Sequence, residues 1–231
     1  MKLNAIALTA AALMVAGAAQ AQVINEFVAN HTGTDTNEYI EVYGAPNTNY
    51  SSLHIVEIEG DVGSTGLIDD ATFQVGTTDA GGFWCTAFLN NVVENGSLTL
   101  LLVEGYSGAV GSDVDVDDDG VIDAPFWTRI VDAVAVTDGG AGDLTYAGFV
   151  LDSSLPPAGF TPGGASRIPN GVDTDSAADW VRNDFDGFGL PGFAGTLDPG
   201  EAINTYCTTN TTDIATPTTS TSFGRIKTLY R

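Results

Sequence analysis

The chain has 231 residues, 43% of them hydrophobic, which is enough to form the core of one large domain. Thirty acidic side chains stand against seven basic ones, for a formal net charge of −23. This charge excludes nucleic-acid phosphates as partners and favours divalent cations. The abundance of Gly, Thr, Val and Asp favours strands and turns over helices.

The first 21 residues contain the three parts of a secretory signal peptide in order. Lys2 supplies the positive start, residues 5–18 form the apolar stretch, and Ala19-Gln20-Ala21 is the cleavage signal. We therefore expect a Sec-type exported protein, secreted or held at the cell surface, whose mature chain begins at Gln22. A buried helix is the alternative interpretation. No later segment reaches 18 apolar residues, so no transmembrane span is expected after cleavage.

After the signal peptide, short apolar runs alternate with turn residues. The predicted strands are residues 23–30, 37–44, 52–60, 72–75, 82–89, 97–104, 127–136, 145–151, 165–168 and 180–181. Residues 97–104 form the most apolar run and predict a central strand. Many short strands separated by turn signals predict an all-β fold, a β-sandwich with long loops and a β/loop-rich C-terminal extension.

The chain has two cysteines, Cys85 and Cys207. Export would place them in an oxidising compartment, so we expect a disulfide between them. Two separate thiols are the alternative. In the chain-entropy account such a bridge contributes at most about 4–5 kcal/mol, and it would tie the C-terminal region to the body of the protein.

The sharpest chemical motif is residues 113–123, with the sequence DVDVDDDGVID. Its alternating aspartates followed by Gly120 match the D-x-D-x-D-G pattern of calcium loops, in which carboxylates on a curled loop converge on one ion. Phe126 stands where an EF-hand carries its bidentate Glu, so this is not a full EF-hand. The predicted Ca²⁺ ligands are Asp113, Asp115, Asp117, Asp119, the carbonyl of Val121, and Asp123. A solvated acidic loop is the alternative, although carboxylates this close repel one another without a counterion.

Other acidic residues give weaker signals. Asp173, Asp175 and Asp179 could gather a second ion, but ordinary turn and surface positions are the favoured interpretation. Glu57 and Glu59 share one face of a predicted strand, where a glycosidase dyad could be formed. The sequence contains no G-x-S-x-G, H-E-x-x-H or phosphate-loop motif. We therefore expect a non-enzymatic protein with no catalytic residues.

The C-terminal end changes character twice. Residues 208–222 are Thr-rich and of low complexity, which predicts a flexible linker. Residues 223–231 are basic and aromatic on an otherwise acidic chain. This tail has the layout of a sorting or attachment signal, and a frayed terminus without function is the alternative.

Several of these segments together resemble one known family. Residues 23–27, 37–44 and 59–61, then 96–103, and the Asp-rich loop ahead of Trp127 and residues 131–134, resemble the lamin-tail domain of exported bacterial proteins. The resemblance covers about residues 22–150, and residues 164–183 are similar to extensions in such proteins. It implies an immunoglobulin-like β-sandwich that serves in binding or attachment, at the cell surface or beside secreted hydrolases. It carries over no catalytic residues.

Two functional hypotheses follow. The first is an exported, non-enzymatic, calcium-stabilised β-sandwich over residues 22–207 for extracellular binding, attachment or self-assembly, with further copies of itself or a cell-surface component as the partner. The second is a secreted metal-dependent hydrolase that acts on a phosphoester or a glycan.

Overall fold

The computed structural model describes residues 22–213, so the signal peptide, residues 214–222 of the predicted linker and the basic tail lie outside the described residues. The described part contains ten strands, one short 3-10 helix and no α-helix. The elements are β1 Val23–Val28, β2 Tyr39–Tyr43, β3 Leu53–Glu59, β4 Ile68–Gln74, β5 Phe83–Cys85, β6 Leu98–Glu104, β7 Arg129–Val136, β8 Val150–Leu151, β9 Gly164–Arg167, η1 Ala177–Asp179 and β10 Trp180–Arg182. No helix in residues 22–213 is long and apolar enough to cross a bilayer.

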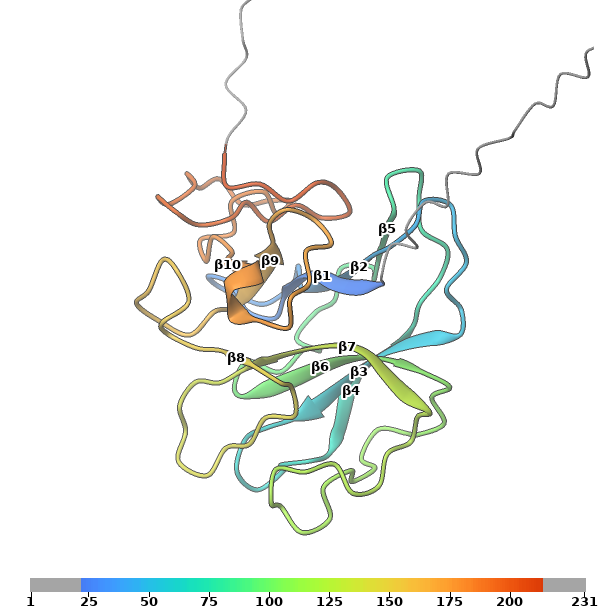
Figure 1. Ribbon diagram of the computed structural model, residues 1–231. Helices are drawn as coiled ribbons and strands as arrows, with labels where there is room; N and C mark the ends of the chain where they lie inside the picture. Colours follow the sequence, from blue (N-terminus) through green and yellow to red (C-terminus); the bar gives the residue numbers. More distant parts are fainter. Residues whose placement is uncertain (1–21, 214–231) are drawn as a thin grey trace, which may run out of the picture.

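The strands form two five-stranded sheets that face each other (Figure 1). The first sheet has the order β10-β9-β1-β2-β5, and the second has the order β4-β3-β6-β7-β8. Every pairing is antiparallel except that of β7 with β8. The predicted all-β sandwich is thus confirmed, and β6, the most apolar predicted strand, is the central strand of the second sheet.

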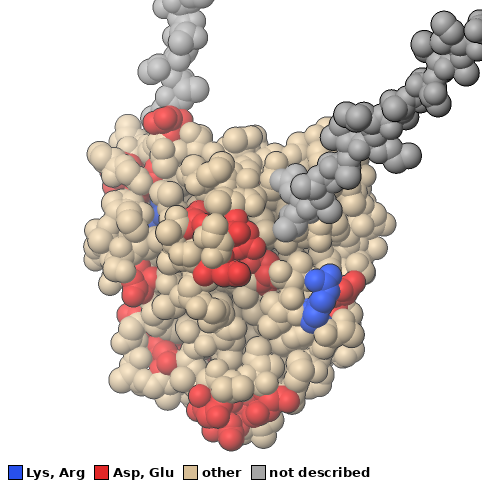
Figure 2. Space-filling view, viewed as in Figure 1, with Lys and Arg blue, Asp and Glu red and all other residues tan. Residues whose placement is uncertain are grey.

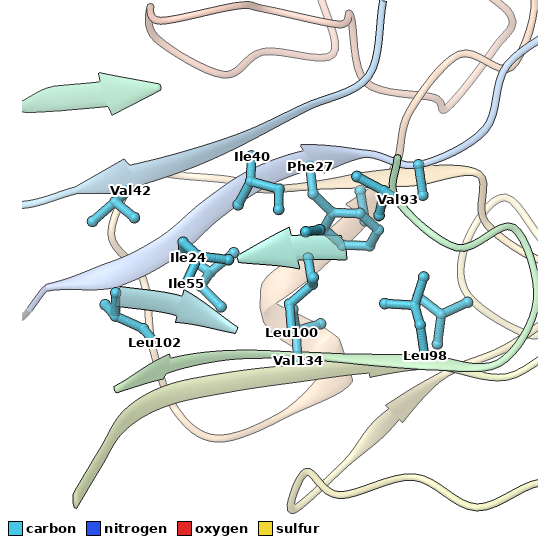
Figure 3. Close-up of a cluster of buried hydrophobic side chains, with 14 of the residues drawn as sticks. Ile24, Phe27, Ile40, Val42, Ile55, Val93, Leu98, Leu100, Leu102 and Val134 are labelled. Carbon is cyan, nitrogen blue, oxygen red and sulfur yellow. The ribbon is translucent and has the colours of Figure 1, made fainter. Parts of the chain in front are cut away.

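The main core lies between the two sheets (Figure 3). Side chains from β1 and β2 meet side chains from β3, β6 and β7, and Val93 of the β5–β6 connection joins them. The fully buried members are Ile24, Phe27, Ile40, Val42, Ile55, Leu100, Leu102 and Val134. Each such side chain contributes about 1.5–3 kcal/mol when it is removed from water, so this layer is the main source of stability.

Both sheets are also covered on their outer faces. Val56 and Ile58 of β3 and Leu101 of β6 pack outward against the β6–β7 connection in a second apolar cluster. On the first sheet, Val28 and Tyr39 pack outward against the C-terminal segment. The central strands are therefore buried on both faces, which explains why the apolar run of β6 is continuous instead of alternating.

The predicted disulfide is confirmed. Cys85 at the end of β5 is bonded to Cys207, across a sequence separation of 122 residues and a Cα–Cα distance of 5.9 Å. No free cysteine remains. The bridge fastens the C-terminal segment to the edge strand of the first sheet, as the sequence predicts.

Buried polar groups attach the rest of this segment to β1. The carboxylate of Glu26 accepts hydrogen bonds from the Asn183 side chain and from both the backbone N–H and the hydroxyl of Thr205, each at 2.9 Å. The Asn210 side chain donates to the carbonyls of Asn25 and Arg167, at 3.1 Å each. Residues 183–210 are thus an integral cover of the first sheet.

A buried ion pair joins the two sheets at one edge. Arg167 of β9 is fully buried, and its Nη2 donates to both carboxylate oxygens of Asp132 on β7, at 3.0 and 3.1 Å. Asp132 also accepts from the N–H of Ile24 at 2.7 Å, and Arg167 Nε donates to the Ile24 carbonyl at 2.9 Å. Strand β9 ends at Arg167, so it does not pair with the backbone of Ile24. The side chains of Asp132 and Arg167 bond the N–H and the carbonyl of Ile24 instead.

We predict that Arg167→Met lowers the free energy of unfolding by about 3–5 kcal/mol, because it leaves the Asp132 carboxylate buried without its partner. Arg129→Met is the matched control. Arg129 pairs with Glu104 at 2.7 Å, but the two side chains are 60% and 39% exposed, so its loss should cost less than about 1 kcal/mol. Urea denaturation of both variants measures the difference, and equal losses would contradict the role given to Arg167.

A second prediction concerns pH. Burial raises the pKa of Glu26 and raises the pKa of Glu41 well above its usual value of 4.5; the charge of Glu26 adds to the shift of Glu41. Such groups stabilise the fold fully below the pKa of the unfolded chain, and the stability is lost as pH rises through the folded pKa. The melting temperature of metal-free protein should therefore fall as the pH rises above 4.5.

Glu41→Gln tests this assignment, because Gln keeps an oxygen to accept the 2.7 Å hydrogen bond from the Asn25 side chain. The variant should melt at a higher temperature than the original chain at pH 8, with little difference near pH 4.5. Parallel melting curves for the two proteins across this range would rule out Glu41 as a source of the pH dependence.

Candidate metal centre

The Asp-rich loop lies in the β6–β7 connection, against the outer face of the second sheet (Figure 1). Acidic side chains gather at this end of the molecule, at the bottom of the view in Figure 2. Val114 is fully buried and Ile122 is partly buried in the outer apolar cluster. These two side chains anchor both ends of the loop to the sheet and leave the acidic residues between them near solvent.

Backbone hydrogen bonds close the loop at its base. The carbonyl of Val114 accepts from the N–H groups of Asp123, at 2.8 Å, and Ala124, at 3.2 Å. On the other side the N–H of Val114 donates to the Gly66 carbonyl at 2.9 Å. Asp113 also forms a bridge with Leu67, just before β4. The loop is therefore a defined ring of backbone attached to the edge of a sheet.

Asp115 organises the interior of the loop. Its side chain is fully buried; Oδ1 accepts from the Asp119 N–H at 3.1 Å, and Oδ2 accepts from the Gly120 N–H at 2.8 Å and the Tyr146 hydroxyl at 2.9 Å. Desolvation alone would raise the pKa of Asp115, but the hydrogen bonds, led by that from Gly120, outweigh it and hold the pKa below its usual value. Gly120 has φ of +87°, which allows the turn that presents its N–H.

Three of the predicted ligands come together. Carboxylate oxygens of Asp115, Asp117 and Asp123 lie within 4.8 Å of one another, and Asp117 and Asp123 are exposed. The pKa of Asp117 is raised, chiefly by the charges of Asp119 and Asp123. Calcium binds oxygens at about 2.3–2.6 Å, so one ion can contact all three carboxylates at this spacing and relieve their repulsion.

The other predicted ligands have different roles in the structure. Asp113 Oδ1 accepts from the Asp115 N–H at 3.0 Å, and Asp119 Oδ1 accepts from the Val121 N–H at 2.9 Å. Both carboxylates stabilise turns, and neither belongs to the group of three. That the Val121 carbonyl is a ligand stays a prediction. With three carboxylates and water as ligands, we expect a dissociation constant of about 10⁻⁴–10⁻³ M, the range of extracellular modules.

The predicted second acidic set is an ion-pair cluster. Arg167 Nη1 donates to Asp173 at 3.2 Å and to Asp179 at 3.4 Å. Asp179 also accepts from the backbone and the hydroxyl of Thr174, at 2.7 and 2.9 Å. Asp175 lies exposed at φ of +53°. The guanidinium thus already supplies positive charge to this set.

Local sequence reasoning missed two residues that shape the centre. Tyr146 is 31 residues from the Asp115 it contacts, and Val114 anchors the loop although the motif treats it as a spacer. No local signal marks Tyr146, because the contact depends on how two connections cover the same sheet. The apolar residue between two aspartates could have indicated that one face of the loop is buried.

No family model, curated protein or solved structure matches the chain. The resemblance to the lamin-tail domain therefore stays a prediction, and the sandwich architecture is established from the strand pairing alone.

We predict opposite calcium responses for two aspartates of the loop. Asp117→Asn should raise the melting temperature in calcium-free buffer, because it removes repulsion, and should lower it in millimolar calcium, because it removes a ligand. Asp115→Ala should lower the melting temperature in both buffers, because the Tyr146 hydroxyl and two partly buried N–H groups lose their acceptor. The expected loss of unfolding free energy is about 1–3 kcal/mol. Thermal denaturation measures both.

The control is Asp175→Asn, which removes one exposed carboxylate at a left-handed position that Asn tolerates. It should respond to calcium as the original chain does. A calcium response that Asp117→Asn leaves unchanged would exclude this loop as the site.

Proposed function

We propose that this chain is an exported, non-enzymatic β-sandwich module that binds calcium through the β6–β7 loop and serves in extracellular binding, attachment or self-assembly. The observation that carries the proposal is the gathering of Asp115, Asp117 and Asp123 at the surface of a loop whose base is closed by backbone hydrogen bonds. The disulfide is compatible with an oxidising compartment, and such compartments hold enough calcium to fill a weak site.

The placement of the loop favours a structural ion over a catalytic one. The loop is an outer connection, with Asp117, Asp119 and Asp123 exposed to solvent. Asp115 is already engaged by three donors, so its carboxylate is held for loop geometry. A metal-dependent hydrolase would need this ion to face a substrate cleft. A cavity of about 170 Å³ at the loop is lined by Asp113 and Asp118 but by none of the three converging aspartates, so the hydrolase alternative has less support.

The surface charge of the described residues limits which partners such a module can bind. All 30 acidic residues lie within residues 22–213, together with three arginines. Arg167 and Arg182 are buried in ion pairs, and exposed Arg129 is paired with Glu104. Copies of this body repel one another unless cations stand between them, so we propose that calcium also mediates its association.

The sheet edges favour calcium-mediated association over the pairing of edge strands between copies. The edge of β4 is bonded to the β6–β7 connection, where Ile68 donates to the Ser112 carbonyl at 2.9 Å. The edge of β10 is bonded to the C-terminal cover, where Ala202 donates to the Arg182 carbonyl at 2.8 Å. The other two edge strands, β5 and β8, are only three and two residues long. Covered edges and very short edge strands both disfavour addition of another strand, which leaves the acidic surfaces as the sites of contact.

We predict that the mature protein is monomeric in chelator and associates in millimolar calcium, at physiological salt. Light scattering and electron microscopy measure the association, and magnesium at the same concentration is the control for simple screening. Equal particle sizes in calcium and chelator would contradict calcium-mediated assembly and leave a ligand or a cell-surface component as the partner.

A further inference from the structure

The strand pair β3–β4 brings together acidic residues that the calcium loop does not use. Ile58 and Ile68 are register partners, and both face the outer apolar cluster. Because side chains alternate along a strand, Glu57 and Glu59 on β3 and Asp69 on β4 face the opposite side, toward the interior of the sandwich. Glu57 is fully buried and Glu59 is 8% exposed.

A fourth carboxylate reaches this place from the β5–β6 connection. Ligand oxygens of Glu59, Asp69 and Glu94 lie within 4.8 Å of one another. Backbone donors orient two of these groups: Glu59 Oε1 accepts from Gly60 and Asp61, both at 3.1 Å. Glu94 Oε1 accepts from Asn95 at 2.8 Å and Gly96 at 3.0 Å. Backbone N–H groups therefore orient the carboxylates of both Glu59 and Glu94.

Glu57 gives an independent indication that something is bound here. Its Oε1 accepts from the Glu94 N–H at 2.9 Å, but its buried Oε2 has no hydrogen-bond partner. Glu57 lies two residues from Glu59 on the same face of β3 and is bonded to the backbone of Glu94, so this oxygen borders the cluster. A buried carboxylate oxygen among three other carboxylates is costly unless a cation or a donor meets it.

No side chain of residues 22–213 supplies that cation. The three arginines of this part of the chain pair with other acids, namely Arg129 with Glu104, Arg167 with Asp132, Asp173 and Asp179, and Arg182 with Glu201. The four carboxylates therefore lack the charge compensation that the Asp173–Asp179 set obtains from Arg167.

We propose that the converging carboxylates of Glu59, Asp69 and Glu94 hold a second calcium ion, which the unpartnered Oε2 of Glu57 also contacts. This ion joins β3 and β4 to the β5–β6 connection. The ligands are all carboxylate oxygens, which suit a hard divalent ion. Calcium takes about six to eight oxygens in a flexible geometry, whereas magnesium demands a near-ideal octahedron and keeps several waters, so a set of protein carboxylates suits calcium. With Glu57 the site offers four carboxylates where the loop offers three, and its carboxylates are less exposed than those of the loop, so it binds calcium more tightly.

The test uses calcium binding to the mature protein and to a loop-disabled variant, Asp117→Asn with Asp123→Asn. Isothermal titration with calcium chloride should show two ions per chain in the original protein and one, the tighter, in the loop-disabled variant. Adding Asp69→Asn to that variant should weaken the remaining ion at least tenfold. Asp70→Asn, which changes the exposed neighbour on the same strand, should leave it unchanged.

The outcomes separate this site from the loop. If the loop-disabled variant binds no calcium, the second site is refuted and the loop stands. If it binds as the original chain does and Asp69→Asn abolishes binding, the loop is refuted and the second site stands. Anomalous diffraction from crystals of the unmutated protein grown in calcium is a check that needs no variant to fold: a peak among the four carboxylates supports the site, and water or no density there overturns it.

Discussion

The contact between Arg167 and Asp132 is the constraint on which the architecture depends. The two sheets of a sandwich are held mainly by non-directional apolar packing, which sets their spacing but not their relative position. This ion pair fixes one point of the second sheet, on β7, to the end of β9 and the backbone of Ile24 in the first sheet. The guanidinium also lies 4.6 Å from the centre of the Trp180 ring, which brings β10 into the same contact.

Two arrangements of acidic residues coexist around this frame. Between the two sheets and in the C-terminal cover, three buried carboxylates meet protein donors: Glu26 meets Asn183 and Thr205, Asp132 meets Arg167, and Glu201 meets Arg182. The loop and the β3–β4 cluster have no basic side chain paired with them among the described residues. At the two proposed calcium sites, ions from solution would supply the missing positive charge, so the stability of the protein should follow the calcium content of its surroundings.

The strands were predictable because most are short apolar runs bounded by turn residues, and the structure places a strand in each of the ten predicted segments. The observed strand boundaries differ from the predicted ones where polar residues lie inside a strand. β4 begins at Ile68 instead of residue 72, because Asp69 and Asp70 have the composition of a turn. Glu41 alternates with Ile40 and Val42, the inward-facing residues of β2, but the C-terminal cover buries its outward-facing side chain as well. That cover depends on contacts such as Glu26 with Thr205, 179 residues apart, which no local pattern reveals.

The same is true of the candidate metal centre. The D-x-D-x-D-G motif predicts a cation-binding loop but not which aspartates converge, because the choice between ligand and turn cap depends on which backbone N–H each carboxylate faces. Asp113 and Asp119 face amides two residues ahead, whereas Asp117 and Asp123 face outward beside Asp115. The Tyr146 hydroxyl, from the β7–β8 connection, donates a hydrogen bond to Asp115, the buried aspartate of this group.

The position of β1 has a consequence for the order in which the fold can be completed. β1 begins at Val23, yet one of its two strand partners, β9, begins at Gly164, and the carboxylate of Glu26 accepts hydrogen bonds from Asn183 and Thr205. A chain that emerges from its N-terminus therefore presents its first strand long before that strand can be fully paired. Completion of the first sheet must wait for nearly the whole chain, and the second cysteine, Cys207, emerges together with the residues that complete it.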